Sequence, residues 1–207
     1  MKKNFGLYVV LTNPVTGYEE CARASAGEGA YIIQLRMKKS PRDEVIKTAE
    51  SVKKVLDGTD SLFIVNDDAE IARLVDADGV HLGQGDMDIV TARTLWTAPD
   101  KIFGLSTHGQ NQHINAIPKN PDYIGVGPVF PTPSKEIPDP VLGLEQLQAI
   151  VSECPLVMVA IGGINHENLS DVLETGVKNY AVVRCVCGSE NPGLAVKKLK
   201  EIERRYL

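Results

Sequence analysis

The sequence predicts an α/β protein built as a closed (β/α)8 barrel, or TIM barrel, with a single domain over residues 1–207. One repeated pattern predicts this fold. Short apolar runs alternate with helix-compatible segments eight times along the chain. The structural alternative is an open doubly wound sheet, but the glycine-rich dinucleotide fingerprint typical of that sheet does not occur. Because 207 residues lie near the lower end of the size range of this barrel, most connections must be short.

The eight expected strands are short runs dominated by aliphatic and aromatic residues. Apolar runs of this length between polar segments are typical of buried strands. They span residues 7–11, 31–35, 62–65, 79–82, 102–105, 123–126, 156–161 and 180–183.

The segments that follow these runs are expected to be helices. From Val45 to Leu56 apolar residues recur at helical spacing, and Pro41 suits the first position of a helix. Gly176 is suited to end the seventh helix. The expected helices span residues 18–27, 41–56, 69–75, 88–96, 110–117, 144–152, 165–175 and 192–206.

Composition narrows the class of function. The net charge is −5 and no basic stripe occurs, so nucleic acid is not an expected partner. No apolar stretch reaches the about 18 residues of a membrane span, and the run at 7–11 is too short for a signal peptide. The four cysteines lack C-x-x-C spacing and are expected to be buried free thiols. A cytoplasmic enzyme or binding protein fits these observations.

The third and fourth expected strands each end in carboxylates. Neighbouring strand ends of a parallel sheet lie side by side, so Asp67 and Asp86 are expected to converge. With Asn66 and His81 beside them, they suit Mg²⁺ bound to a substrate phosphate. Asp68 is expected instead to cap the following helix. For His81 the alternative is a histidine of the barrel core.

The second strand ends in two basic residues. Strand alternation turns Gln34, Arg36 and Lys38 to one side, toward the mouth of the barrel if Leu35 faces the helices. Arg36 then offers a forked donor to phosphate oxygens, and Lys38 a mobile point charge. The alternative is a strand end with ordinary solvated basic residues.

Polar residues also follow the fifth and sixth strands. Ser106 is as well suited to cap a helix as to bind a ligand, and His108 is a candidate acid or base. The long proline-rich connection at 127–143 carries Thr132 and Lys135, which suit a phosphate site with a movable cover.

The last two strands end in a pattern typical of the phosphate site of this barrel. Gly162 and Gly163 allow close approach of the backbone to a ligand, and a helix follows them. Val183 and Arg184 follow the eighth strand. Taken alone, the glycine pair would indicate only a tight turn. Together with the metal site, this second anion site predicts a diphosphate leaving group and a monophosphate on a co-substrate.

Motifs at these strand ends resemble those of the thiamine phosphate synthase family (thiamine-phosphate pyrophosphorylases) over essentially the whole chain. They are QLRMK at 34–38, FIVNDD at 63–68, ADGVHLGQGD at 77–86, GLSTH at 104–108, DYIGVGPVFPTPSK at 122–135, VAIGGI at 159–164 and AVV at 181–183.

The resemblance implies condensation of a pyrimidine diphosphate with a methylthiazole phosphate, or its carboxylated form, to give thiamine phosphate. Pyrophosphate is expected to leave first, so that a carbocation forms on the pyrimidine methylene. Mg²⁺ would bind Asp67 and Asp86. The expected catalytic residues, which stabilise the departing diphosphate, are Arg36, Lys38, Ser106 and Lys135. The expected substrate-binding residues are Gln34, Leu35, Arg36, Met37, Lys38, Asn66, His81, Ser106, Thr132, Pro133, Ser134, Lys135, Gly162, Gly163, Val183 and Arg184.

The chain departs from the family pattern at three positions. Arg184 stands where the family usually has Ser, Asn13 where it usually has Asp, and Ser134 where Thr is commoner. An arginine at 184 would either add a phosphate contact or crowd the thiazole.

Two alternative functions follow from the same residues. One is a thiazole tautomerase, which resembles this family but needs a proton-transfer histidine, for which His108 is the candidate, rather than a metal. The other is a non-catalytic barrel that binds thiamine precursors. The presence of both Asp67 and Asp86 favours the synthase. The oligomeric state stays open, with a homodimer as one option.

Overall fold

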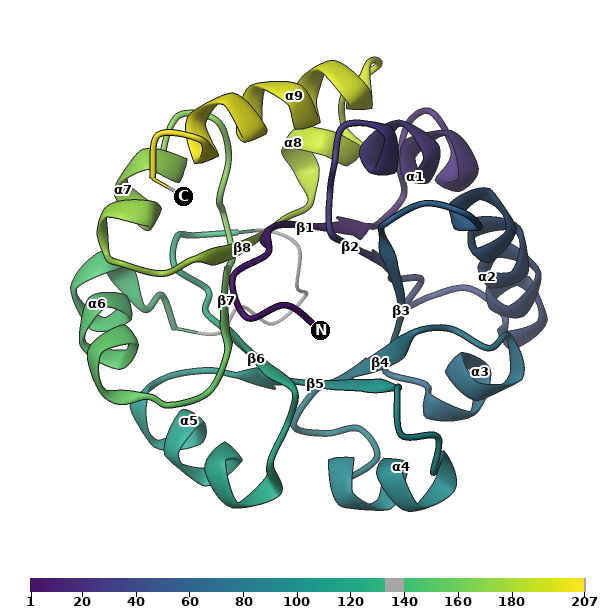
Figure 1. Cartoon of the computed structure of the whole chain (residues 1–207), viewed down its shortest axis with the longest axis horizontal. Helices are drawn as coiled ribbons and strands as arrows, with labels where there is room; N and C mark the ends of the chain where they lie inside the picture. The colour runs from purple at the N-terminus through teal and green to yellow at the C-terminus, as the bar shows by residue number, and fades with distance from the viewer. Residues whose placement is uncertain (133–139, 207) are drawn as a thin grey trace.

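The computed structural model describes residues 1–132 and 140–206, apart from the side chains of residues 110 and 111. Parallel strands form a closed barrel in the order β1 to β8, and helices surround it (Figure 1). Each strand pairs with the next along the chain, and β8 closes onto β1. The predicted (β/α)8 fold is therefore confirmed.

The strands agree closely with the expected apolar runs. They are β1 (Gly6–Leu11), β2 (Ile32–Leu35), β3 (Leu62–Asn66), β4 (Gly79–Leu82), β5 (Ile102–Thr107), β6 (Tyr123–Val126), β7 (Met158–Ile161) and β8 (Asn179–Val182).

The helices confirm the expected segments and add two short ones. They are α1 (Tyr18–Gly27), α2 (Arg42–Leu56), α3 (Ala69–Leu74), α4 (Ile89–Leu95), α5 (Gln110–Ala116), α6 (Gly143–Glu153), α7 (Leu169–Glu174), α8 (Arg184–Cys187), α9 (Pro192–Glu203) and the 3₁₀ helix η1 (Ile117–Lys119). The expectation that Val183 ends a strand is corrected, because β8 stops at Val182 and Val183 precedes α8.

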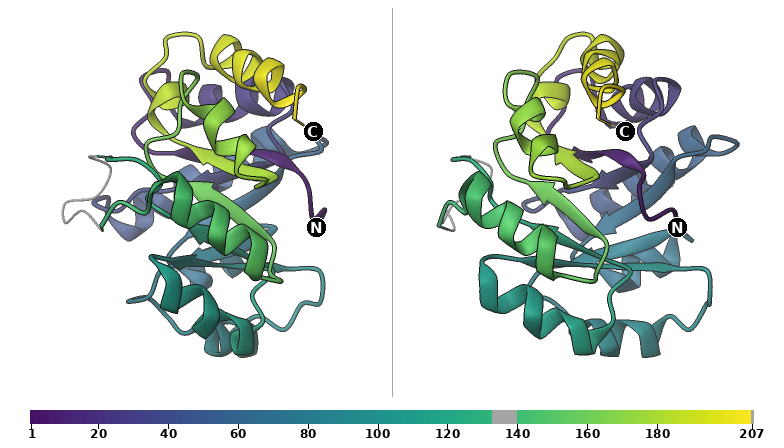
Figure 2. Two further views of the ribbon diagram at one scale, coloured as in Figure 1. Left: turned by 90° about the vertical axis from the view of Figure 1, so that its left-hand side faces the viewer. Right: turned by 60° about the vertical axis from the view of Figure 1, so that its left-hand side comes forward.

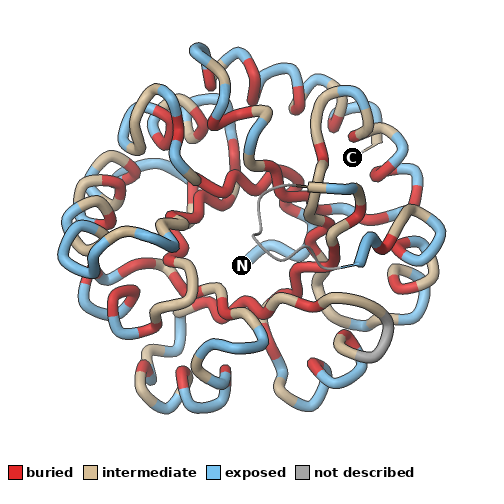
Figure 3. The backbone as a smooth tube through the Cα atoms, turned by 180° about the vertical axis from the view of Figure 1, so that it is seen from behind, coloured by how far each residue is buried: buried red, intermediate tan, exposed pale blue. Residues whose placement is uncertain are grey.

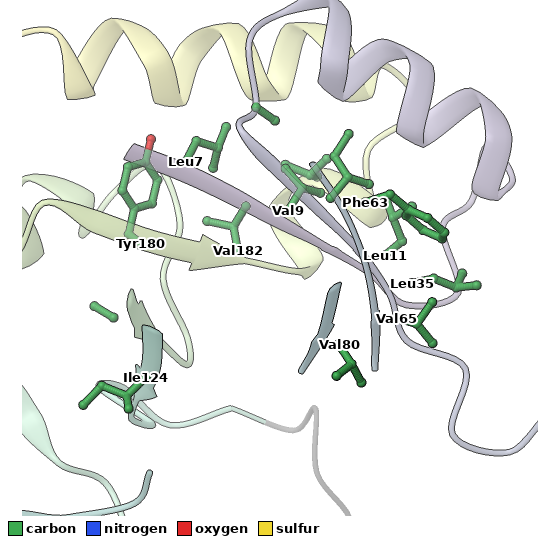
Figure 4. Close-up of a cluster of buried hydrophobic side chains, with 14 of the residues drawn as sticks. Leu7, Val9, Leu11, Leu35, Phe63, Val65, Val80, Ile124, Tyr180 and Val182 are labelled. Atoms are coloured by element: carbon green, nitrogen blue, oxygen red, sulfur yellow. The ribbon is translucent and has the colours of Figure 1, made fainter. Parts of the chain in front are cut away.

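Alternate residues of each strand face two different cores. Leu7, Val9 and Leu11 of β1 point away from the barrel axis into the layer between the strands and the helices (Figure 4). Tyr8 and Val10 point inside the barrel. In Figure 3 buried residues lie along the strands and on the helix faces turned toward them. This alternation decides which strand residues can reach a ligand in the mouth.

The N-terminal end of the barrel is covered by the first residues of the chain, which cross it (Figure 1). The Phe5 ring stacks on Tyr31 with centroids 5.2 Å apart, and the Phe5 amide donates to Asn179 Oδ1 at 2.6 Å. Both chain ends lie on the same side of the molecule (Figure 2).

Two sequence expectations can be checked on the fold as a whole. All four cysteines are free thiols, as expected, but only Cys21 and Cys187 are fully buried, whereas Cys154 and Cys185 are partly exposed. Within the described part of the chain, no helix has both the length and the apolar character needed to cross a membrane.

Candidate active site

A cavity of about 740 Å³ opens at the C-terminal ends of the strands. Its volume suits a ligand of the size of a small cofactor or two small substrates. Of the residues expected to bind substrate, the following line it: Gln34, Arg36, Asn66, His81, Ser106, Thr132, Gly162, Gly163, Val183 and Arg184. The sequence-predicted mouth and the observed cavity therefore coincide over most strand ends, whereas Lys38, Asp67 and Asp86 are not among the lining residues.

The residues at the end of β2 and directly after it divide between two environments. Gln34 is only 3% exposed and donates through Nε2 to the Tyr8 hydroxyl at 2.7 Å. Arg36 lines the cavity, and burial lowers the pKa of its guanidinium while Asp67 opposes that shift. Leu35 and Met37 were expected among the substrate contacts. The Leu35 side chain lies in the outer core and Met37 packs against that core, so a substrate contact at these two positions stays a prediction.

The acids after β3 and β4 do converge. Burial, followed by the neighbouring Asp86 carboxylate, raises the pKa of Asp67 above its ordinary value, and Lys38 opposes this shift. Lys38 Nζ lies 3.2 Å from Asp67 Oδ2. The Asp67 amide donates to the carbonyl of His81 at 2.8 Å, which fixes the end of β3 against β4. Asp68 accepts from the Ile71 amide at 2.8 Å, so its prediction as the cap of α3 is confirmed.

This acid pair fits a hard divalent cation. Two close carboxylates repel each other, and a cation between them removes that repulsion. No group of three or more acidic, histidine or cysteine side chains that could hold a metal occurs in the described ranges. Mg²⁺ commonly accepts one or two protein carboxylates and completes its shell with water and substrate phosphates. The two acids therefore suffice in number for that ion.

His81 and Ser106 form a pair at the inner wall of the cavity. His81 Nε2 lies 2.8 Å from Ser106 Oγ, and its Nδ1 lies 3.0 Å from the Tyr123 hydroxyl. Ser106 is not a helix cap, because α5 begins at Gln110 after Gly109. His81 combines features of a core histidine and of a residue near the substrate. It contacts Tyr123 of the barrel core and also lines the cavity.

The opposite wall is formed mainly by backbone, with Arg184 as its charged side chain. Gly162 and Gly163 have φ of 103° and 68°. A Cβ on Gly163 would lie 2.7 Å from Phe130 Cβ and 2.9 Å from the Pro131 carbonyl oxygen. The chain can therefore bring its backbone to the cavity here only with glycine.

Arg184 opens the short helix α8 and lines the cavity. Its guanidinium forms no hydrogen bond or ion pair with any residue in the described ranges. Pro133, Ser134 and Lys135, which were expected to bind substrate, lie outside the described residues.

Sequence reasoning missed several lining residues. Thr12, which follows β1, and Asn165, which follows the glycine pair, both line the cavity. The position of Thr12 directly after an apolar run was a usable signal. His108 was named only as a candidate acid or base. It lines the cavity, and its Nδ1 lies 2.9 Å from the Gly127 carbonyl oxygen.

Comparison with known proteins gives consistent matches. A family model described as thiamine monophosphate synthase matches residues 7–186. A thiamine-phosphate synthase from Pyrococcus furiosus is 37% identical over 207 residues, which cover 100% of this chain and 99% of the relative. One from Prochlorococcus marinus is 43% identical over 171 residues, 83% of this chain, but the match spans only 49% of that relative.

A solved structure agrees with the sequence matches. Thiamine phosphate pyrophosphorylase from Pyrococcus furiosus superposes with a TM-score of 0.90 at 37% identity, covering 99% of this chain and 98% of that one. A 3-hexulose-6-phosphate synthase structure, with a TM-score of 0.69 and 18% identity, shares the fold alone.

Proposed function

The chain belongs to the thiamine monophosphate synthase family and is a transferase; we propose that it condenses 4-amino-2-methyl-5-hydroxymethylpyrimidine diphosphate with a methylthiazole phosphate. The thiazole phosphate is either the plain or the carboxylated form. Thiamine phosphate and pyrophosphate are the products, and the carboxylated form would also release CO₂. The active-site cavity and the family matches support this proposal.

One observation carries the proposal: the cavity has anion-binding groups of different kinds on opposite arcs of the barrel. Charged side chains follow β2 to β4, and glycine backbone with Arg184 follows β7 and β8. In the closed strand order, β1 separates the two arcs on one side, and β5 and β6 separate them on the other. Two substrates that each carry phosphate can thus be held with their reacting ends facing each other. This arrangement supplies proximity for the reaction.

The charged arc is suited to the departing diphosphate. Negative charge grows on this group as the bond to the pyrimidine methylene breaks, and the electron-rich ring stabilises the carbocation. Arg36 lines the cavity and Lys38 forms an ion pair with Asp67, and we assign both to that charge. Removal of one such donor typically costs about 3–4 kcal/mol of barrier. When bound by Asp67 and Asp86, Mg²⁺ would supply further charge neutralisation to the diphosphate. The thiazole nitrogen then attacks the carbocation and completes the transfer.

This route requires no protein nucleophile. Burial raises the pKa of the Cys185 thiol, the cysteine that lines the cavity, to about 12, so it stays protonated at neutral pH. The acid pair favours the synthase over a tautomerase, which would use His108 as a proton carrier and would not need Asp67 and Asp86.

The test is pyrophosphate release from the pyrimidine diphosphate and thiazole phosphate, measured with Mg²⁺ and again with a chelator. We expect chelator-sensitive pyrophosphate release in equal amount to thiamine phosphate. Aromatisation of the thiazole phosphate without pyrophosphate would identify a tautomerase. Substrate binding without turnover would identify a carrier, and either result would overturn the proposal.

A further inference from the structure

Five side chains form one continuous hydrogen-bond chain through the inside of the barrel. Gln34 Nε2 donates to the Tyr8 hydroxyl at 2.7 Å, and the hydroxyls of Tyr8 and Tyr123 lie 2.9 Å apart. The Tyr123 hydroxyl lies 3.0 Å from His81 Nδ1, and His81 Nε2 lies 2.8 Å from Ser106 Oγ. Both ends of the chain, Gln34 and Ser106, line the cavity, but the tyrosines do not.

The two tyrosines are held as neutral phenols. Tyr8 is 2% exposed and Tyr123 is fully buried. Burial raises the pKa of both phenols well above their ordinary value. The Tyr123 ring fits because β5 carries Gly104 beside it, where a Cβ would lie 2.2 Å from Tyr123 Cζ. The sequence thus leaves space in the barrel for this chain.

A neutral phenol has one proton to donate, so the direction of each bond follows from the donation by Gln34 Nε2 to Tyr8. Tyr8 accepts from Gln34, so its own proton is satisfied by donation to Tyr123. Tyr123 then donates to His81 Nδ1, which places the histidine proton on Nε2. His81 Nε2–H then donates to Ser106, and the Ser106 hydroxyl, which lines the cavity, keeps its own proton for donation to a ligand.

We propose that Tyr8 and Tyr123 are positioning residues that set the tautomer of His81 and make Ser106 a hydrogen-bond donor to the substrate. The chain also couples its two ends. If the Gln34 carboxamide turned over, every bond would reverse and Ser106 would donate to His81 instead of to the ligand. In the observed direction, the Gln34 carbonyl oxygen remains to accept from a ligand. The cavity thereby offers a ligand one acceptor, the Gln34 carbonyl oxygen, and one donor, the Ser106 hydroxyl, and the hydrogen-bond chain couples the two. The catalytic consequence of this arrangement rests on the proposed function.

The first test is the tautomer of His81, read by ¹⁵N NMR of the histidine rings in the ligand-free protein at a pH where His81 is neutral. A His81→Gln variant assigns the signals. We expect the proton on Nε2 and a hydrogen-bonded, unprotonated Nδ1. A proton on Nδ1 would overturn the proposal, and this result does not depend on any enzymatic activity.

The second test compares two tyrosine variants. Tyr123→Phe removes the donor to Nδ1, so both tautomers should appear. Tyr8→Phe leaves the Tyr123 donor in place, so the His81 signals should keep the Nε2 form while the link to Gln34 is lost. An unchanged His81 spectrum in Tyr123→Phe would contradict the proposal. If that variant does not fold, the wild-type and Tyr8→Phe spectra still decide.

A matched control is Tyr180→Phe. Tyr180 is equally buried and donates to Glu203 at 3.0 Å, but it lies in the outer core. We expect Tyr123→Phe to lower kcat roughly tenfold, as for the loss of one oriented hydrogen bond, and to change KM little. Tyr180→Phe should change neither kcat nor the His81 signals. An equal loss of kcat in both variants would indicate a merely structural role for Tyr123. If no variant and no wild-type protein shows turnover, the proposed function fails, while the NMR result still stands.

Discussion

The two arcs of the barrel mouth, after β2 to β4 and after β7 and β8, offer different kinds of anion-binding group. After β2 to β4, the groups are side chains: Arg36 lines the cavity, and Lys38 and Asp86 lie beside Asp67. After β7 and β8, the groups are mainly backbone, made accessible by glycine. In the proposed function, the first arc receives the cation and the diphosphate, whereas the second receives the single phosphate of the thiazole. The difference indicates which substrate each arc receives, and variants of each arc should separate the two roles.

The largest effect is expected at the charged arc. Asp67→Asn should lower kcat by roughly 100- to 1000-fold, because it removes one carboxylate of the proposed metal site. The fold should survive, because Asn tolerates the φ of 66° at this position. Steady-state kinetics with Mg²⁺ titration and a thermal melt measure both quantities.

The adjacent acid provides a matched control. Asp68→Asn changes charge equally but keeps a helix cap, so activity should remain near that of the unchanged protein. Full activity of Asp67→Asn at an unchanged melting temperature would refute the metal assignment.

A smaller and more selective effect is expected at the backbone arc. Gly163→Ala forces a side chain into a positive-φ position and against Phe130 and Pro131. We expect KM for the thiazole phosphate to rise about tenfold and KM for the pyrimidine diphosphate to stay unchanged, with a loss of about 1–2 kcal/mol in the free energy of unfolding.

Gly176→Ala separates strain from function. Gly176 has φ of 91°, but a Cβ at this position would meet Val151 Cγ1 only at 3.6 Å, which is an ordinary contact distance. The residue does not line the cavity. It should lose similar stability with no change in either KM. A rise in the KM of both substrates in Gly163→Ala would show that the two arcs do not act separately.

The smallest effect is expected at Arg184. Arg184→Ser removes a cationic side chain that lines the cavity, so KM for the thiazole phosphate should change several-fold while the Mg²⁺ dependence stays constant. The measurement is a pair of KM values at fixed Mg²⁺. An unchanged KM would mean that the guanidinium does not reach the co-substrate.

The sequence alone was sufficient to predict the barrel fold and the convergence of Asp67 and Asp86 in the charged arc. Repeated alternation of apolar runs and helical segments leaves few arrangements that bury every run, and closure into a barrel is one of them. Parallel strands end at one edge, so Asp67 and Asp86 had to approach each other once β3 and β4 paired. Local pattern and sheet geometry together sufficed for this part of the site.

Helix α8 could not be read from the sequence. The apolar run at 180–183 continues strand character through Val183, and Cys185-Val-Cys187 has no helical signature of its own. The backbone turns at Val183, with φ of −125° and ψ of −81°, and α8 then packs against α9. Tertiary contacts therefore decided where Arg184 stands.

The tyrosines show most clearly what only the tertiary structure decided. Tyr8, Tyr123 and Tyr180 all occur in apolar strands, and the sequence by itself places each of them in a buried strand. Tyr8 and Tyr123, which are 115 positions apart, meet inside the barrel, whereas Tyr180 faces the helices. Alternation specifies only that neighbouring residues face opposite sides. Which side is the interior depends on how the eight strands close, and that closure brings Gln34, His81 and Ser106 onto one hydrogen-bond chain.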